Sequence, residues 1–141
     1  MKPLNPSTLA RPRGYSHGIL GDGRVLFVAG QVGCNANGEL VSDDFTSQFD
    51  QALGNVLAVV TDAGGMPQSI GRFTIYVVNK QEYLEAQREI GERYRARMGR
   101  HYPAMTLVEV RSLLEAGAKV EIEATAMIAD RNPQSSQTPT S

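Results

Sequence analysis

The chain has 141 residues, of which 41% are hydrophobic and 21% charged, and its formal net charge is −1. These values suit one globular domain and give no positive field for nucleic acid or an anionic membrane. No apolar run reaches the roughly 20 residues that cross a bilayer, and the first residues lack the apolar stretch of a signal peptide. The single cysteine, Cys34, fits a reducing compartment. We therefore expect a cytoplasmic protein that binds neither nucleic acid nor membrane.

The two ends of the chain differ in composition from its centre. Residues 1–12 contain Pro3, Pro6 and Pro12, which predict an irregular N-terminal arm. Residues 131–141 contain no large apolar side chain and predict a flexible tail. Residues 13–130 are the expected domain.

Seven elements are expected in this domain, in the order β-β-α-β-α-β-β. They are strands at 15–20 and 24–29, a helix at 45–63, a strand at 72–78, a helix that begins after Asn79, and strands at 105–110 and 119–128. The turn residues at 21–23 predict a hairpin between the first two strands. Asp43 or Asp44 can cap the first helix, whose apolar residues recur at three- and four-residue steps, and Gly64 ends it.

The strand at 72–78 carries apolar residues on both of its faces. Phe73, Ile75 and Val77 point one way, while Thr74, Tyr76 and Val78 point the other. A sheet with one wet face alternates apolar and polar residues, and two helices cover only one face. We therefore expect a partner subunit on the second face. The alternative is that residues 1–14 fold across it.

Several short segments together carry a resemblance to a known family. They are Arg-Gly-Tyr-Ser-His-Gly at 13–18, Val-Ala-Gly-Gln-Val at 28–32, Gly-Glu-Leu-Val at 38–41, Pro-Ala at 103–104, Val-Glu-Val at 108–110 and Val-Glu-Ile-Glu-Ala at 120–124. Gln48, Leu53 and Asn55 fit the same pattern in the first helix. In this order and spacing, residues 13–129 resemble the Rid (reactive intermediate deaminase, YjgF-type) family.

The resemblance implies a fold and a reaction. The fold is a chorismate-mutase-like α+β domain with a mixed sheet and two helices on one face, assembled as a homotrimer with a small-molecule cleft at each subunit boundary. The reaction is hydrolysis of an enamine or imine to a carbonyl compound and ammonia. Family enzymes use no metal and no organic cofactor, so none is expected here.

The resemblance also implies three site residues. Glu121 stands where the family has a glutamate thought to order the attacking water. Tyr15 stands at a cleft-lining tyrosine, and Gly30 at a glycine whose backbone approaches the ligand. Each has an ordinary alternative: a solvated edge of the sheet for Glu121, a half-buried aromatic for Tyr15 and a turn for Gly30.

Position 105 departs from the family pattern. Met105 follows Pro103-Ala104 where the family has an arginine that binds the substrate carboxylate. Methionine has no charge and no donor, so we expect Met105 to line the substrate site and to alter its preference. Arg88 is a candidate replacement cation, although the favoured interpretation is another exposed helix arginine, and Arg72 and Arg13 are further candidates.

Two functions follow from these residues. The first is a Rid-like imine deaminase with altered substrate preference. The second is a non-catalytic trimer that binds a small molecule in the same cleft.

Overall fold

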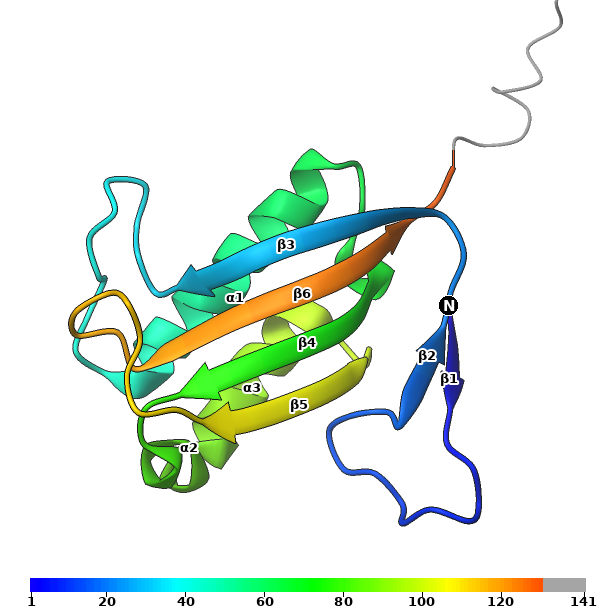
Figure 1. Cartoon of the computed structure of the whole chain (residues 1–141), viewed down its shortest axis with the longest axis horizontal. Helices are drawn as coiled ribbons and strands as arrows, with labels where there is room; N and C mark the ends of the chain where they lie inside the picture. Colours follow the sequence, from blue (N-terminus) through cyan, green and yellow to red (C-terminus); the bar gives the residue numbers. More distant parts are fainter. Residues whose placement is uncertain (131–141) are drawn as a thin grey trace, which may run out of the picture.

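The computed structural model describes residues 1–130, so the predicted flexible tail at 131–141 lies outside the described residues. The strands are β1 (Lys2–Leu4), β2 (Gly18–Leu20), β3 (Arg24–Val32), β4 (Ile70–Val77), β5 (Ala104–Glu109) and β6 (Val120–Ile128). The helices are α1 (Phe45–Asp62), α2 (Lys80–Glu85) and α3 (Gln87–Met98), and a 3₁₀ turn spans Pro67–Ser69 (Figure 1).

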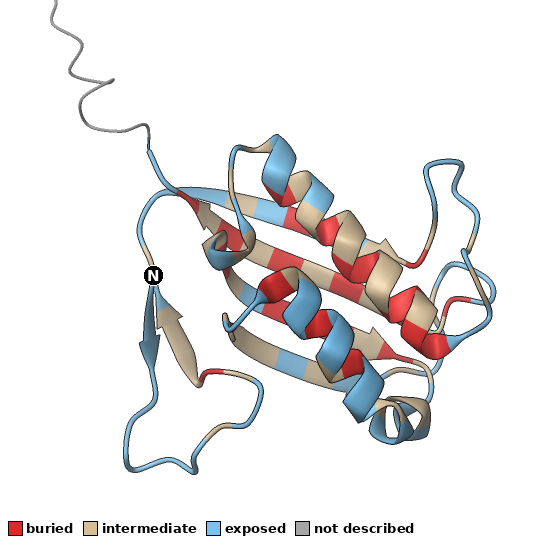
Figure 2. Cartoon of the chain, turned by 180° about the vertical axis from the view of Figure 1, so that it is seen from behind, coloured by how far each residue is buried: buried red, intermediate tan, exposed pale blue. Residues whose placement is uncertain are grey.

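The main sheet has four strands in the order β3-β6-β4-β5. Strand β6 runs antiparallel to β3 and to β4, while β4 and β5 are parallel and are joined by the crossover through α2 and α3. Helices α1 and α3 lie across one face of the sheet, with their buried residues turned toward it (Figure 2). The expected α+β fold, a mixed sheet with two main helices, is confirmed.

The core lies between these helices and the sheet. The side chains of strand β6 alternate strictly in burial from Val120 to Ile128. The even-numbered residues are buried against the helices, and the odd-numbered residues on the other face are half-buried. Phe73 of β4 and Leu53 of α1 are each 1% exposed, which places them at the centre of the core. Asp44 caps α1 by accepting a hydrogen bond from the Ser47 amide at 3.0 Å, as predicted.

The other face of the sheet carries apolar side chains that no helix covers. We call it the open face; Figure 1 looks onto it. Phe27 of β3 is 79% exposed there, and Val25 and Val108 are also exposed. These exposed apolar side chains fit the expectation that a partner subunit covers this face, which stays a prediction.

The predicted hairpin is wrong. Strand β2 does not pair with β3; it pairs with β1, in a separate ribbon where Pro3 lies opposite Ile19. Strand β3 pairs with β6 instead. Gly23, at φ 126°, forms an open bend whose missing Cβ leaves room for the Ile128 carbonyl at the end of β6. Long-range pairing therefore outweighs the local turn signal.

The N-terminal arm also differs from its prediction. Residues 1–12 were expected to be irregular, but Lys2–Leu4 forms a strand, which Pro3 permits because a two-stranded ribbon leaves one backbone edge unpaired. Met1 approaches Gly21 and Gly71, so the ribbon lies beside one end of the open face. Phe27 stays exposed, so the arm does not cover this face.

The second helix differs as well. It was expected to run unbroken from Asn79, which does cap α2 by accepting from the Gln81 amide at 3.0 Å. The backbone leaves helical geometry at Ala86, and α3 starts anew at Gln87. Neither glycine nor proline stands at the break, so no local residue signal marks it.

Candidate functional site

Glu121 and Gly30 meet on the open face. Glu121 lies in β6, opposite Val32 of β3 on one side and Tyr76 of β4 on the other. Gly30 lies where the register of β3 against β6 shifts. A Cβ on Gly30 would stand 2.8 Å from the carboxyl carbon of Glu121, so a side chain there would require the Glu121 carboxylate to move. The absence of a side chain at Gly30 thus makes room for the Glu121 carboxylate.

The neighbouring polar groups leave that carboxylate available. The Tyr76 hydroxyl donates to Glu123 at 2.7 Å, and this hydrogen bond raises the pKa of Tyr76, with smaller contributions from burial and from the charges of Glu123 and Glu121. Within residues 1–130, no hydrogen bond reaches the Glu121 carboxylate. Glu121 can therefore accept a hydrogen bond from water or ligand.

Met105 lines a hollow on the opposite, helix-covered side of the sheet. Met105 and Leu107 of β5 pack toward the helices, whereas Val108 faces outward. The hollow, called the Met105 hollow below, has a volume of about 340 Å³. Its walls include Arg13, Tyr83, Ile90, Gly91, Tyr94 and Arg95. This volume is in the range of small-molecule sites.

The aromatic wall of the Met105 hollow is neutral. Tyr94 stacks on Tyr102 with ring centroids 5.6 Å apart and an interplanar angle of 13°. Its hydroxyl donates to the His101 carbonyl at 2.7 Å, and burial raises the pKa of the Tyr94 phenol. None of the described residues that line the hollow carries a carboxylate, so its two arginines set its charge.

Tyr15 lies beside this hollow rather than in it. The segment that carries it is fixed to the start of β5, because the Ser16 amide and hydroxyl donate to the carbonyls of Pro103 and Tyr102 at 3.1 and 2.6 Å. Tyr15 lines an adjacent depression of about 590 Å³. The two depressions share Gly14 and Tyr102.

Arg88 lies outside the Met105 hollow. Its side chain is 93% exposed, and its guanidinium stands 3.9 Å from the Glu92 carboxylate on the same helix. Sequence reasoning missed Arg95, which does line the hollow and which looks like any other arginine of α3. The sequence feature that could have indicated Arg95 is Gly91, one helical turn earlier. A glycine there leaves room on the same side of α3 for the side chain of Arg95.

The predicted site residues thus form two groups on opposite faces of the sheet. Glu121 and Gly30 lie on the open face, and Met105 lies on the helix side with Tyr15 nearby. The four-stranded sheet separates the groups within one chain.

Two further observations concern the described residues 1–130 as a whole. No three His, Cys, Asp or Glu side chains among them are grouped so that they could hold a metal ion. No helix in this part of the chain is long and apolar enough to span a membrane.

The thiol of Cys34 has a raised pKa, first through burial and then through the charge of Glu115. The raised pKa disfavours the reactive thiolate.

Comparison with known proteins gives a consistent result. Residues 7–128 match the family described as Endoribonuclease L-PSP. A RutC family protein of Pyrococcus horikoshii is 32% identical over 126 residues, covering 89% of each chain. The 2-iminobutanoate/2-iminopropanoate deaminase of Salmonella typhimurium is 30% identical over 108 residues, covering 74% of this chain and 80% of its own.

Among solved structures, a Yersinia pestis protein of unknown function in the conserved Rid family, YyfB, is similar with a TM-score of 0.79. It is 36% identical, and the match covers 90% of this chain and 98% of that one.

Proposed function

Because the chain belongs to the Endoribonuclease L-PSP (YjgF/Rid) family, we propose that it hydrolyses a reactive imine or enamine to a carbonyl compound and ammonia. The observation that carries this proposal is the Glu121 carboxylate, held beside Gly30 and free to accept a hydrogen bond. In the reaction, Glu121 orients a water and takes its proton as the water oxygen bonds to the imine carbon. Nitrogen takes one proton from solvent as the C=N bond becomes a C–N bond, and Glu121 then returns its proton to nitrogen. Ammonia leaves as the C–N bond breaks, and the added hydroxyl loses its proton to solvent and becomes the carbonyl.

We also propose that the working unit is a homotrimer, with the site at the boundary between subunits. Members of the family are typically homotrimers. The exposed Phe27 and Val25 supply an apolar surface for that assembly. Glu121 and Met105 lie on opposite faces of one sheet, so a second copy is the natural source of the other half of the site.

Met105 supports an altered substrate preference. A small 2-imino acid presents its carboxylate directly beside the reacting carbon, and Met105 offers that carboxylate no donor. The loss of a charge-assisted hydrogen bond costs about 1.5–3 kcal/mol, or roughly ten- to a hundred-fold in binding. We therefore expect weak activity on 2-iminopropanoate compared with substrates that have larger apolar parts.

The test is release of ammonia and carbonyl product from a panel of freshly generated imines and enamines. Wild-type protein should accelerate release from at least one member, and Glu121→Gln, which keeps the size of the side chain, should reduce the rate at least a hundred-fold. Equal rates for both proteins across the panel would leave the alternative, a trimer that binds a small molecule without turnover.

A second variant tests the role of position 105. Met105→Arg supplies the cation on the strand side of the hollow, so activity on 2-iminopropanoate should rise roughly ten-fold or more. Met105→Gln is the matched control, because it gives a polar side chain of similar length without charge. An equal rise in both variants would contradict the explanation by charge.

A further inference from the structure

We propose that Arg95, assisted by Arg13, binds the carboxylate of the ligand from the helix side of the Met105 hollow. Arg95 thereby replaces the cation that is absent at position 105. The ligand class is a carboxylate with an apolar or aromatic body. This role rests on the proposed function for turnover, but its binding step can be measured separately.

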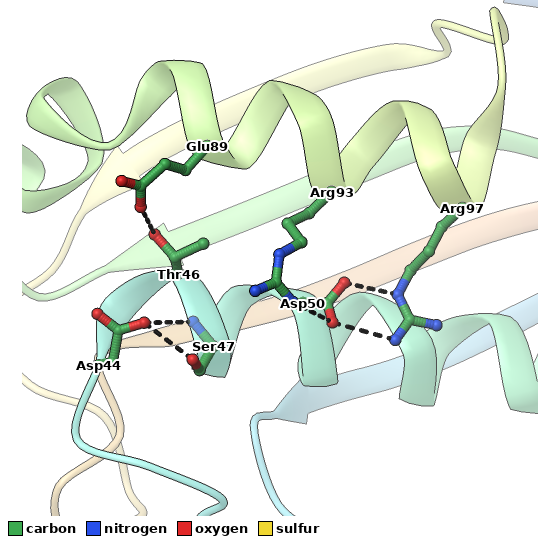
Figure 3. A network of polar contacts seen from close by, with 7 residues as sticks. All are labelled: Asp44, Thr46, Ser47, Asp50, Glu89, Arg93 and Arg97. Atoms are coloured by element: carbon green, nitrogen blue, oxygen red, sulfur yellow. Dashed lines mark hydrogen bonds and ion pairs between the residues drawn. The ribbon is translucent and has the colours of Figure 1, made fainter.

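The other arginines of α3 already have carboxylate partners. Asp50 of α1 accepts from Arg97 at 2.8 Å and from Arg93 at 3.1 Å, and this pairing joins the two helices (Figure 3). The hydrogen bond from Arg97 is the main reason that the pKa of Asp50 lies below its usual range. Arg88 stands opposite Glu92. These side chains serve the fold and the helix surface.

Arg95 and Arg13 are different. Both are exposed residues at the rim of the Met105 hollow, and within residues 1–130 neither guanidinium has a carboxylate within ion-pair distance. An unpaired guanidinium presents its donors in a planar fork that matches a carboxylate. Two such groups around one hollow give it a positive potential that favours an anionic ligand.

Gly91 explains why Arg95 reaches the hollow. Side chains on a helix lean toward its N-terminus, so Arg95 lies over residue 91, one turn earlier. A Cβ at Gly91 would stand 3.2 Å from the guanidinium nitrogen of Arg95, closer than ordinary packing allows. Glycine at this position thus lets the guanidinium fold back along α3, where Gly91 itself also lines the hollow.

The remaining walls define the body of the ligand. Ile90 and Met105 are apolar, and Tyr83, Tyr94 and Tyr102 contribute ring surfaces. Such walls suit a hydrocarbon or aromatic group rather than a second charge. A carboxylate held by Arg95 approaches α3, whereas one held by an arginine at position 105 would approach β5.

The experiment is calorimetric titration of the full-length protein with phenylacetate and with its neutral amide, phenylacetamide. Wild type should bind phenylacetate more tightly than the amide. Arg95→Gln should weaken phenylacetate binding roughly ten- to a hundred-fold and leave amide binding within about two-fold. Arg24→Gln is the control, because Arg24 is 68% exposed and starts strand β3 at the far edge of the sheet.

Several outcomes would overturn the proposal. Equal affinity for phenylacetate and phenylacetamide would show that the Met105 hollow does not recognise the negative charge of the carboxylate. Loss of binding in Arg88→Gln but not in Arg95→Gln would assign the cation to Arg88. An effect of Arg95→Gln on an oligoribonucleotide and not on phenylacetate would assign the hollow to a phosphodiester. By contrast, binding that behaves as predicted in a protein without imine turnover would support the carboxylate site and remove only the proposed function.

Discussion

The two faces of the main sheet both carry apolar side chains, but only one face is covered within the described chain. On the helix side, Phe73 is 1% exposed beneath α1 and α3, and the chain satisfies its own packing there. On the open face, Phe27 is 79% exposed and has no cover within the chain. The first face holds the core of the chain, and the second is the surface that we propose for assembly.

The same contrast applies to charge. Arg97 and Arg93 are paired with Asp50 between the helices, while Arg95 and the Glu121 carboxylate lack partners of this kind within residues 1–130. Arg95 is exposed and Glu121 is half-buried, so water solvates both groups in the single chain and both remain available to a ligand or a second subunit. The following substitutions test this contrast between side chains that are packed or paired within the chain and those that are not, from the largest expected effect to the smallest.

Phe73→Ala tests the helix side. Removing this buried ring should lower the free energy of unfolding by about 3–5 kcal/mol, because a cavity remains in the core. Urea denaturation followed by circular dichroism measures it. The loss should be the same at low and high protein concentration. A cost that depends on concentration would mean that Phe73 acts through assembly.

Phe27→Asp tests the open face. The charge should prevent burial of this surface and convert the proposed trimer to a monomer that keeps its circular dichroism spectrum. Analytical ultracentrifugation measures the mass. Leu84→Asp is the control, since Leu84 is also exposed but lies on helix α2. If Phe27→Asp stays trimeric, the open face is not the interface.

Gly30→Ala tests the apposition with Glu121. The added methyl group would displace the carboxylate and should lower imine turnover roughly ten-fold or more, without loss of the folded state. Gly18→Ala is matched, because a Cβ there meets nothing closer than 3.8 Å. Similar turnover in both variants would argue against a role for the Glu121 position.

Asp50→Asn tests the paired arginines. At pH 7 the variant should lose about 1 kcal/mol of stability, the scale of a charge-assisted pair that is partly exposed. The folded pKa of Asp50 lies below its unfolded value of about 3.9. Its contribution is therefore present above pH 4 and is lost as pH falls through the folded pKa. Stability measured from pH 7 to pH 2 should show the two proteins converging at acid pH.

Local signals in the sequence predicted much of the fold. Asp44 and Asn79 cap helices as expected because a cap depends only on neighbouring residues. The apolar pattern of 72–78 revealed both faces of the sheet. The ribbon of β1 and β2 was missed because it pairs segments about 16 residues apart that share no turn.

The site was predictable in part for the same reason. Glu121 and Gly30 followed from the family resemblance, and the structure places them together. Arg95 could not be distinguished from Arg88, Arg93 or Arg97, because pairing with Asp50 of another helix decides which arginines remain free. A helical sequence does not show which charges a distant element neutralises.

The most direct test of the account mixes two inactive proteins. Glu121→Gln removes the carboxylate from the open face, and Gly91→Phe fills the Met105 hollow. After unfolding and joint refolding in equal amounts, half of the subunits keep the carboxylate and half keep the open hollow. About one quarter of the boundaries in a random trimer then combine both, so roughly a quarter of the wild-type imine turnover should return. Mixed trimers, verified by native mass spectrometry, that remain as inactive as either parent would contradict a site shared between subunits.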